Sequence, residues 1–151
     1  MLSPELSRYT GYLVRRVQQL HASLWQRELR SEVTSVQFGV LSLLEVNPGI
    51  DQRTLGGLLQ LDRSTITDVV LRLEGRGYIE RVRDSADRRR NVLTLTGLGR
   101  RELVSLVPHA ERVNVDLVGG LGPDDQAELI RLLTLLLESQ TSWEIGGAAG
   151  H

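Results

Sequence analysis

The stretch LDRSTITDVVLRLEGRGYIERVRDSADRRRNVLTLT, residues 61–96, decides the fold that we expect for this chain of 151 residues. Gly77 divides it, because glycine readily takes the left-handed conformation in which many helices end. Before Gly77, residues 62–76 place apolar side chains at the spacing of one buried helix face: Ile66, Val69, Val70 and Leu73. After Gly77, two short β-prone runs flank a polar segment with the composition of a hairpin loop. A helix followed by an arginine-tipped hairpin is the outline of a winged helix-turn-helix.

The opposite face of the 62–76 helix carries short polar and guanidinium groups, which can hydrogen-bond base edges and phosphates. Thr65 and Thr67 are candidates for contacts to base edges or thymine methyl groups. The carboxylate of Asp68 must accept from a cytosine or point away from the DNA. The DNA-binding residues expected on this helix are Arg63, Ser64, Thr65, Thr67, Asp68 and Arg72.

Helical spacing continues on both sides of this stretch. Apolar residues recur every three or four positions over residues 4–28, which predicts a first helix long enough to need a partner. Thr34 and Gln37 have the spacing of a capping box that opens a second helix. We expect this second helix to bury Val36, Val40, Leu41 and Leu44.

Asp51 is a plausible N-cap of a short third helix, which leads into the turn before the DNA-facing helix. Two further helices are predicted after the hairpin, the last of them apolar over more than half of its circumference. Residues 139–151 lack periodicity, and we expect them to form a disordered tail. The expected organisation is one domain over residues 1–138, with a winged helix at 34–96 and dimerisation helices at 4–28 and 96–138.

Composition narrows the class of protein. A hydrophobic content of 40% with 25% charged residues is typical of a soluble globular domain. No apolar run approaches the roughly 20 residues that span a bilayer, and no signal-peptide pattern is present, so we expect no membrane association and a cytoplasmic protein. Cysteine is absent and the three histidines are scattered, so we expect no metal site and no cofactor. Phosphate-loop and hydrolase motifs are also missing, which argues against an enzyme.

The hairpin segment carries the most specific pattern in the chain. Residues 84–99 read DSADRRRNVLTLTGLG, which resembles the wing signature of the MarR family of bacterial transcriptional regulators, D-x-x-D-R-R followed by L-T-x-x-G. Supporting matches are RSTIT at residues 63–67, Leu73-Glu74 followed by Gly77, and VQFGVL at residues 36–41. The resemblance extends over residues 6–138.

The resemblance implies an all-α fold with a small β-hairpin wing, and a homodimer in which the first and last two helices interlock. Each recognition helix then enters a major groove and each wing a minor groove of a palindromic operator in double-stranded DNA. We expect Arg89 to enter the minor groove and Asp87 to clamp its guanidinium. The alternative is that Asp84 and Asp87 are ordinary turn formers and that the arginines are solvated. The wing residues expected at the DNA are Arg83, Asp87, Arg88, Arg89 and Arg90.

Regulators of this family are typically repressors released by small aromatic or phenolic acids, so the resemblance implies an effector site near the dimer helices. An arginine can pair with a carboxylate and Trp25 can stack on a ring. For each candidate the alternative is a side chain at the surface or in the dimer seam. The candidate ligand-binding residues are Tyr12, Arg16, His21, Trp25 and His109.

The predicted function is therefore a sequence-specific, dimeric DNA-binding regulator, most simply a ligand-released repressor. A second reading is a winged-helix module that binds protein without DNA. The arginine-rich wing tip favours the first reading, because a protein-binding module tolerates a neutral wing.

Overall fold

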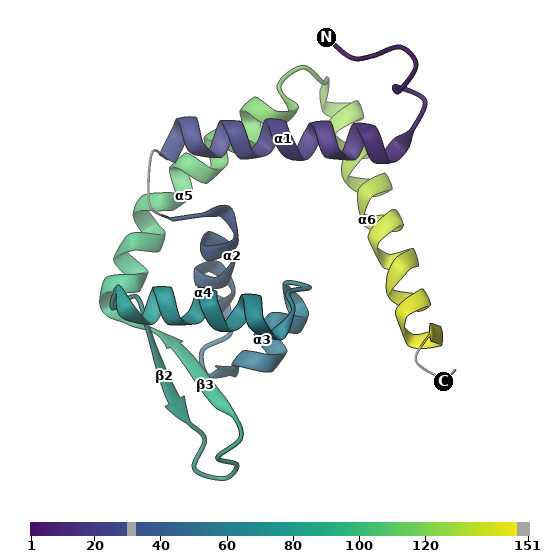
Figure 1. Cartoon of the computed structure of the whole chain (residues 1–151). Helices are drawn as coiled ribbons and strands as arrows, with labels where there is room; N and C mark the ends of the chain where they lie inside the picture. The colour runs from purple at the N-terminus through teal and green to yellow at the C-terminus, as the bar shows by residue number, and fades with distance from the viewer. Residues whose placement is uncertain (30–32, 148–151) are drawn as a thin grey trace. The chain divides into compact units, whose positions relative to one another are not determined.

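The chain folds into helices and one small sheet, and the computed structural model describes residues 1–29 and 33–147. These residues divide between two units, Met1–Val113 and Asn114–His151. Six helices and a three-stranded antiparallel sheet in the described part confirm the mostly helical fold class with a β-hairpin wing (Figure 1). The elements are α1 (Thr10–Leu29), α2 (Ser35–Val46), β1 (Ile50–Asp51), α3 (Gln52–Leu58), α4 (Arg63–Gly75), β2 (Ile79–Arg83), β3 (Asn91–Leu95), α5 (Gly97–Val118) and α6 (Pro123–Gly147).

The start of α2 has the expected capping box. The backbone N–H of Gln37 donates to the hydroxyl of Thr34, and the backbone N–H of Thr34 donates to the Gln37 side chain, each at a distance of 3.1 Å. This fold-back buries Gln37, which is 5% exposed, whereas Val36 is 38% exposed. The expectation that Val36 is buried is therefore wrong, because the buried face of α2 begins at the capping residue; Val40, Leu41 and Leu44 are buried as expected.

Helices α3 and α4 form the helix-turn-helix. Asp51 caps α3 by accepting from the backbone N–H of Thr54 (3.0 Å), and Asp62 caps α4 by accepting from that of Thr65 (2.7 Å). Gly56 lies where the two helices approach each other, since a Cβ there would be 3.2 Å from Cγ2 of Ile66. Side-chain packing at this distance fixes the angle between the two helices.

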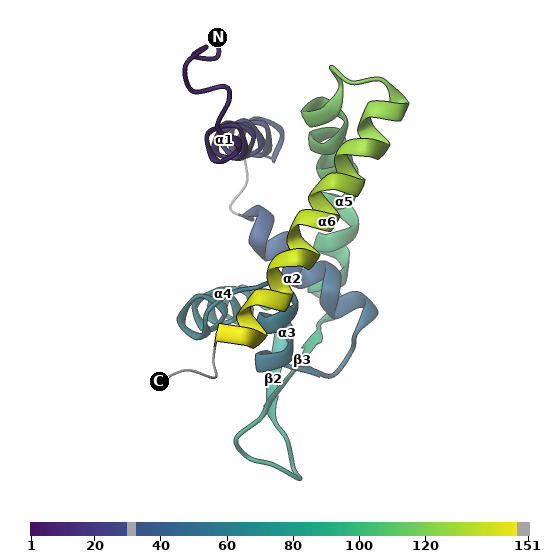
Figure 2. The same cartoon turned by 90° about the vertical axis from the view of Figure 1, so that its right-hand side faces the viewer.

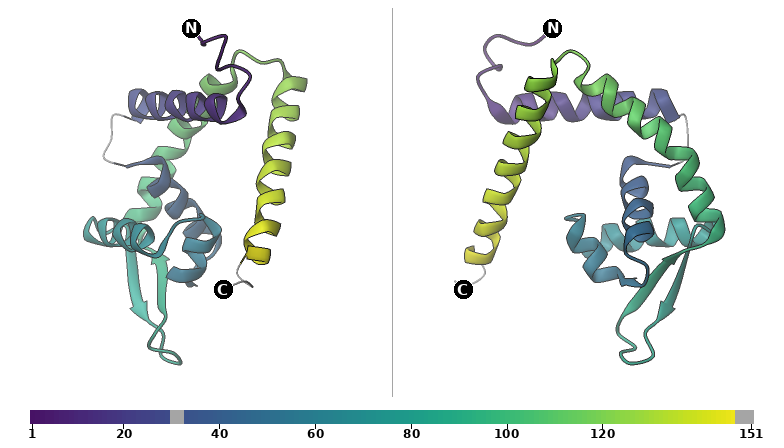
Figure 3. Two further views of the ribbon diagram at one scale, coloured as in Figure 1. Left: turned by 45° about the vertical axis from the view of Figure 1, so that its right-hand side comes forward. Right: turned by 180° about the vertical axis from the view of Figure 1, so that it is seen from behind.

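Gly77 ends α4 in the left-handed conformation that we expected, with φ +76°. Its N–H donates to the carbonyl of Glu74 (2.9 Å), and the N–H of Tyr78 donates to that of Leu73 (3.0 Å). This pair of bonds is a Schellman cap. The chain then enters β2, and the β2–β3 hairpin projects beyond α2, α3 and α4 in all the views (Figures 1, 2 and 3).

The sheet has a third strand that the sequence did not predict. Its order is β1-β3-β2, with Ile50 opposite Leu93 and Asp51 opposite Val92. The strand is only two residues long, so it has no alternating pattern to recognise. It joins the wing directly to the segment that starts α3.

The L-T-x-x-G pattern forms the base of the wing. The Thr96 hydroxyl donates to the carbonyl of Gly77 (2.5 Å) and accepts from the N–H of Gly99 (3.0 Å), so it closes the turn and caps α5. Gly99 packs against the backbone of Tyr78, where a Cβ would lie 1.9 Å from the carbonyl oxygen. The motif thus attaches the hairpin to α4 and α5 through the hydrogen bonds of Thr96 and the close packing of Gly99.

Two helix ends differ from the expected ones. The first helix was expected to start at residue 4, but α1 begins at Thr10. Residues 4–8 form turns instead, in which both the backbone N–H (2.9 Å) and the hydroxyl (2.6 Å) of Ser7 donate to the carbonyl of Ser3. The last helix was expected to end at Glu138, but α6 continues to Gly147, because no glycine or proline interrupts residues 139–145. Residues 148–151 of the expected disordered tail lie outside the described residues.

No helix of the part that the structure describes combines the length and the apolarity needed to cross a bilayer.

Candidate nucleic-acid interface

Helix α4 presents the polar face that the sequence predicted. Arg63, Thr65, Asp68 and Arg72 are exposed, and opposite them Ile66, Val70 and Leu73 are buried. The guanidinium groups of Arg63 and Arg72 form no hydrogen bond or ion pair with any other residue that the structure describes. Both groups are therefore available to an anionic partner.

Two hydroxyl groups on α4 are already engaged within the protein. Thr67 is half-buried; its hydroxyl donates to the carbonyl of Arg63 (2.7 Å) and accepts from Nε2 of Gln52 (3.2 Å). The hydroxyl has no hydrogen left to donate, so its methyl group and one acceptor lone pair remain for the expected DNA contact. Ser64 donates its single hydroxyl hydrogen to Oδ1 of Asp62 (2.9 Å), so a hydrogen bond to phosphate requires this side chain to turn.

Gln52 is a residue near this face that the sequence analysis missed. It is the first residue of α3, and its Oε1 is buried with no hydrogen-bond partner among the described residues. Its bond to Thr67 joins α3 to α4, which no local pattern in the sequence indicates.

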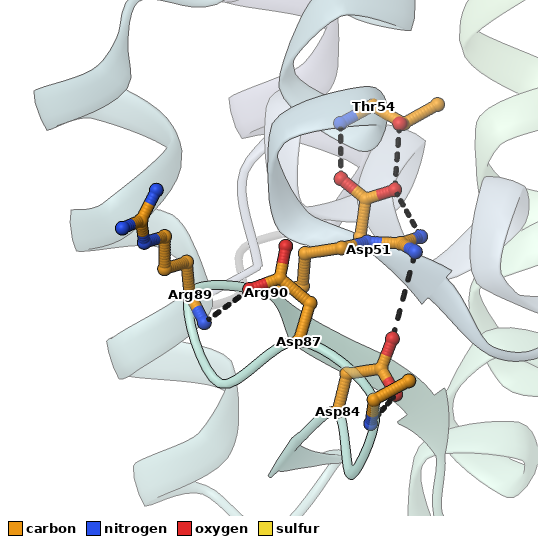
Figure 4. Close-up of polar contacts among 7 residues, drawn as sticks. Asp51, Thr54, Asp84, Asp87, Arg89 and Arg90 are labelled. Atoms are coloured by element: carbon orange, nitrogen blue, oxygen red, sulfur yellow. Dashed lines mark hydrogen bonds and ion pairs between the residues drawn. The ribbon is translucent and has the colours of Figure 1, made fainter.

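The two aspartates of the wing tip are turn formers. Oδ1 of Asp84 accepts from the backbone N–H of Ala86, and Oδ1 of Asp87 accepts from the backbone N–H of Arg89, each at a distance of 3.0 Å (Figure 4). The expected clamp between Asp87 and the Arg89 guanidinium is not formed in this structure. A short acidic side chain bonds most easily to the backbone two residues further on, so Asp87 orders the turn that carries Arg89.

The wing arginines divide into two groups. Arg83 donates to the carbonyl of Arg88 (3.3 Å), and Arg90 pairs with Oδ2 of Asp51 (3.1 Å) and Oδ2 of Asp84 (3.5 Å). Arg88 and Arg89 are exposed, and their guanidinium groups bond to no other residue in the described ranges. Figure 4 shows Arg89 directed away from the aspartates that surround Arg90.

The carboxyl groups at the starts of α3 and α4 are held in their charged forms. The backbone N–H and then the hydroxyl of Thr54, followed by Arg90, lower the pKa of Asp51 to about 2. The N–H of Thr65 in the same way lowers the pKa of Asp62 below its ordinary value. Negative charge at a helix N-terminus is favourable, because it interacts with unpaired backbone N–H groups.

The structure brings together only part of the expected ligand site. The ring centroids of His21 and Trp25 lie 6.1 Å apart, and those of Trp25 and Phe38 lie 5.5 Å apart. The sequence analysis did not select Phe38. Nine residues separate Tyr12 from His21 on α1, about two and a half turns, so Tyr12 and Arg16 lie on the opposite side of the helix.

His109 belongs to a charged cluster between α1 and α5. Its Nδ1 lies 3.0 Å from Oε1 of Glu28 and 2.8 Å from a guanidinium nitrogen of Arg112, which also donates to Glu28. Arg112 first, and then His109, lower the pKa of Glu28. Glu28, three residues after Trp25 on α1, is thus engaged with His109 and Arg112, while the indole N–H of Trp25 donates to the carbonyl of Val33 (3.0 Å).

Comparison with known proteins agrees with this geometry. A sequence model of the MarR family matches residues 33–90. The PcaV transcriptional regulator from Streptomyces coelicolor, solved in complex with its natural ligand, is 40% identical, with a TM-score of 0.86 over 93% of this chain and 99% of that one. BpsR from Bordetella bronchiseptica, whose DNA binding is regulated by 6-hydroxynicotinic acid, is 31% identical, with a TM-score of 0.82 over 86% and 94%. The repressor CouR, solved on a 23-mer DNA duplex, is 32% identical, with a TM-score of 0.83 over 91% and 99%.

A winged helix-turn-helix with an arginine-bearing wing and these relatives define a class of bacterial transcriptional regulator. The chain belongs to the MarR family, as the pattern of residues 84–99 predicted.

Proposed function

We propose that this regulator binds double-stranded DNA as a homodimer, with α4 in a major groove and the tip of the wing in a minor groove. One observation carries the proposal. Within the unit Met1–Val113, Arg63 and Arg72 on α4 and Arg88 and Arg89 on the wing are exposed, with guanidinium groups that bond to no other described residue. Free guanidinium groups are suited to phosphates and to the negative potential of a narrow minor groove.

The apolar surface of the terminal helices supports dimerisation. Val14, Val17 and Leu20 on α1 are each about half exposed in the single chain. In the second unit, α6 has leucine and isoleucine on more than one face, and one helix cannot bury them all. A two-fold axis then relates the two recognition helices, so the operator is a palindrome with half-sites about one helical turn apart.

The test is selection of bound duplexes from a random pool, followed by affinity measurements at several salt concentrations. If each subunit neutralises three or four phosphates, log K falls with log salt at a slope of roughly -5 to -7 for the dimer. Arg89→Ala is expected to weaken binding and to flatten this slope by nearly 2, while the dimer stays intact. Arg101→Ala, an exposed position on α5, is the matched control and should leave the slope unchanged.

The competing function, a winged-helix module that binds only protein, predicts a different outcome. Duplex affinity would then be weak and the same for Arg89→Ala and the wild-type chain. Recovery of a palindromic consensus from the pool would exclude this alternative. Because bacterial chromosomal DNA lies in the cytoplasm, the proposed function places this regulator there as well.

We propose further that the chain represses transcription and that a small aromatic acid releases it. The ring cluster of His21, Trp25 and Phe38 offers stacking surfaces for an aromatic ligand. His109 and Arg112, which bond to Glu28 three residues after Trp25 on α1, can bind a carboxylate that displaces Glu28. A coupling free energy of about 1–3 kcal/mol between ligand and DNA lowers operator affinity roughly 5- to 150-fold.

The test of release is a panel of hydroxylated benzoic, cinnamic and nicotinic acids, measured by thermal shift and by competition with bound DNA. An effector should raise the melting temperature of the free protein and release the duplex, and Trp25→Leu should reduce both effects. If no acid in the panel changes either measurement, the release proposal fails while DNA binding stands.

A further inference from the structure

Arg90 is unlike its neighbour Arg89, although the two are adjacent and identical in type. Its guanidinium lies between two carboxylates, 3.1 Å from Oδ2 of Asp51 and 3.5 Å from Oδ2 of Asp84 (Figure 4). Asp84 belongs to the wing, but Asp51 lies 39 residues before Arg90 in the chain. Arg90 thus connects the hairpin to a different part of the fold.

Asp51 is a fixed attachment point. Its backbone pairs with Val92 of β3, and its carboxylate also accepts from the N–H (3.0 Å) and the hydroxyl (2.7 Å) of Thr54. The side chain is only 15% exposed. A carboxylate held by these two hydrogen bonds, on a backbone paired with β3, has little freedom to follow a moving arginine, so the pair restrains the wing relative to α3.

The restraint continues from α3 to the reading helix. Gly56 of α3 packs at close range on Ile66 of α4, and Gln52 of α3 donates to Thr67 of α4. The orientation of the wing is therefore linked to that of α4 through the N-terminal end of α3. Backbone pairing with β1 reaches only Leu93 and Val92 of the hairpin, so the Arg90–Asp51 pair restrains a part of the wing that β1 does not contact.

The charge around Arg90 argues against a contact to phosphate. One guanidinium serves two carboxylates, and moving Arg90 to a phosphate would leave Asp51 and Asp84 without that partner. Arg89 has no such restraint, and its side chain is directed away from this cluster (Figure 4).

We propose that Arg90 is a positioning residue and not a DNA contact: its ion pair with Asp51 fixes where the wing, and with it Arg89, meets the DNA relative to α4. The inference rests on the proposed DNA-binding function. It assigns the sequence specificity of the protein partly to a pair of side chains that do not touch DNA.

The experiment compares two duplexes of equal length and composition, one selected from a random pool by the wild-type protein and one with its sequence shuffled. The main variants are Arg90→Gln, which removes the charge, and Asp51→Asn, which removes the charge toward Arg90 but keeps a good N-cap for α3. Arg89→Gln is the matched control for an arginine that contacts DNA. Melting temperatures of all variants report damage to the fold.

The expected results separate positioning from contact. Arg89→Gln should flatten the salt dependence on the shuffled duplex by about 0.9 per subunit, whereas Arg90→Gln should leave it unchanged. Both Arg90→Gln and Asp51→Asn should lower the ratio of selected to shuffled affinity by about 5-fold or more. The double variant should lower this ratio no further than either single change, since both break one pair. Arg90→Lys, which keeps a positive charge near Asp51, should recover part of the ratio.

Two outcomes would overturn the inference. A flattened salt dependence in Arg90→Gln, equal to that of Arg89→Gln, would make Arg90 a phosphate contact. A lower melting temperature with an unchanged affinity ratio in Arg90→Gln and Asp51→Asn would make the pair purely structural. Failure of the wild-type protein to prefer any selected duplex would instead contradict the proposed function, so the two failures are distinguishable.

Discussion

Replacing Gly99 by alanine tests how the base of the wing is built. A Cβ at this position would lie 1.9 Å from the carbonyl oxygen and 2.8 Å from the carbonyl carbon of Tyr78. That oxygen also accepts from the N–H of Thr96 (3.1 Å), so the backbone of Tyr78 cannot withdraw without weakening the bond that holds the hairpin to α5. The clash is with backbone, and no side-chain rotation relieves it.

The expected cost follows from the kind of clash. Added methyl groups in well-packed sites typically cost about 1–3 kcal/mol when side chains can shift, so we expect about 3 kcal/mol or more at Gly99. For a chain of 151 residues, 1 kcal/mol corresponds to about 2–4 °C in melting temperature. Gly99→Ala should therefore lower the melting temperature by roughly 6–12 °C or more.

Gly57→Ala is the matched control, because it makes the same chemical change in α3, where a Cβ meets nothing within 4 Å. Gly57 is the last residue but one of α3, so alanine there should raise stability by at most the roughly 0.5–1 kcal/mol that it contributes over glycine in the middle of a helix. Both variants are measured by circular dichroism and by urea unfolding at one fixed protein concentration, since the stability of a dimer depends on concentration. A melting temperature of Gly99→Ala within about 2 °C of the wild type would refute this account of the L-T-x-x-G motif.

Three further predictions concern side chains with defined hydrogen bonds. Thr34→Ala should cost about 1 kcal/mol in urea unfolding by removing the α2 cap, whereas Thr34→Ser should be nearly neutral. Asp51 has a folded-state pKa of about 2 against an ordinary 3.8, so its contribution to stability is full above about pH 4 and lost as the pH falls toward 2. The urea midpoints of the wild type and Asp51→Asn should accordingly converge over that interval; a constant difference would contradict the shift. Thr67→Val should lower stability by about 1 kcal/mol, because the hydroxyl bonds within the protein, yet leave the preferred bases unchanged in a repeated DNA selection.

Features that depend on neighbouring residues could be predicted from the sequence. The capping box at Thr34 and Gln37, the N-cap at Asp51 and the left-handed end of α4 at Gly77 each need only a few consecutive residues to form. Their hydrogen bonds close within one turn of chain, so the residue types alone indicate the geometry. The order of helices and hairpin follows from these ends together with the apolar spacing.

Features that depend on distant partners could not be predicted. Strand β1 forms because Ile50 and Asp51 pair with β3, and a run of two residues is too short to show a strand pattern in the sequence. The same meeting brings Asp51 to Arg90, so one carboxylate acts both as the predicted cap and as an unpredicted partner of the wing. The sequence shows three consecutive arginines at residues 88–90, and only the tertiary structure distinguishes the one that is held.

This distinction sets a limit on the salt dependence of DNA binding. Among the residues of one chain that we expect at the DNA, four arginines have a guanidinium that bonds to no other described residue: Arg63, Arg72, Arg88 and Arg89. Arg83 and Arg90 are engaged within the protein. If only the free groups neutralise phosphates, the slope of log K against log salt for the dimer cannot be steeper than about -7. Affinities for the selected duplex at four or five salt concentrations measure this slope, and Arg83→Gln should leave it unchanged. A wild-type slope near -10, or a less negative slope in Arg83→Gln than in the wild type, would contradict this limit. Either result would mean that the engaged arginines leave their partners on binding and that the wing changes shape at the DNA.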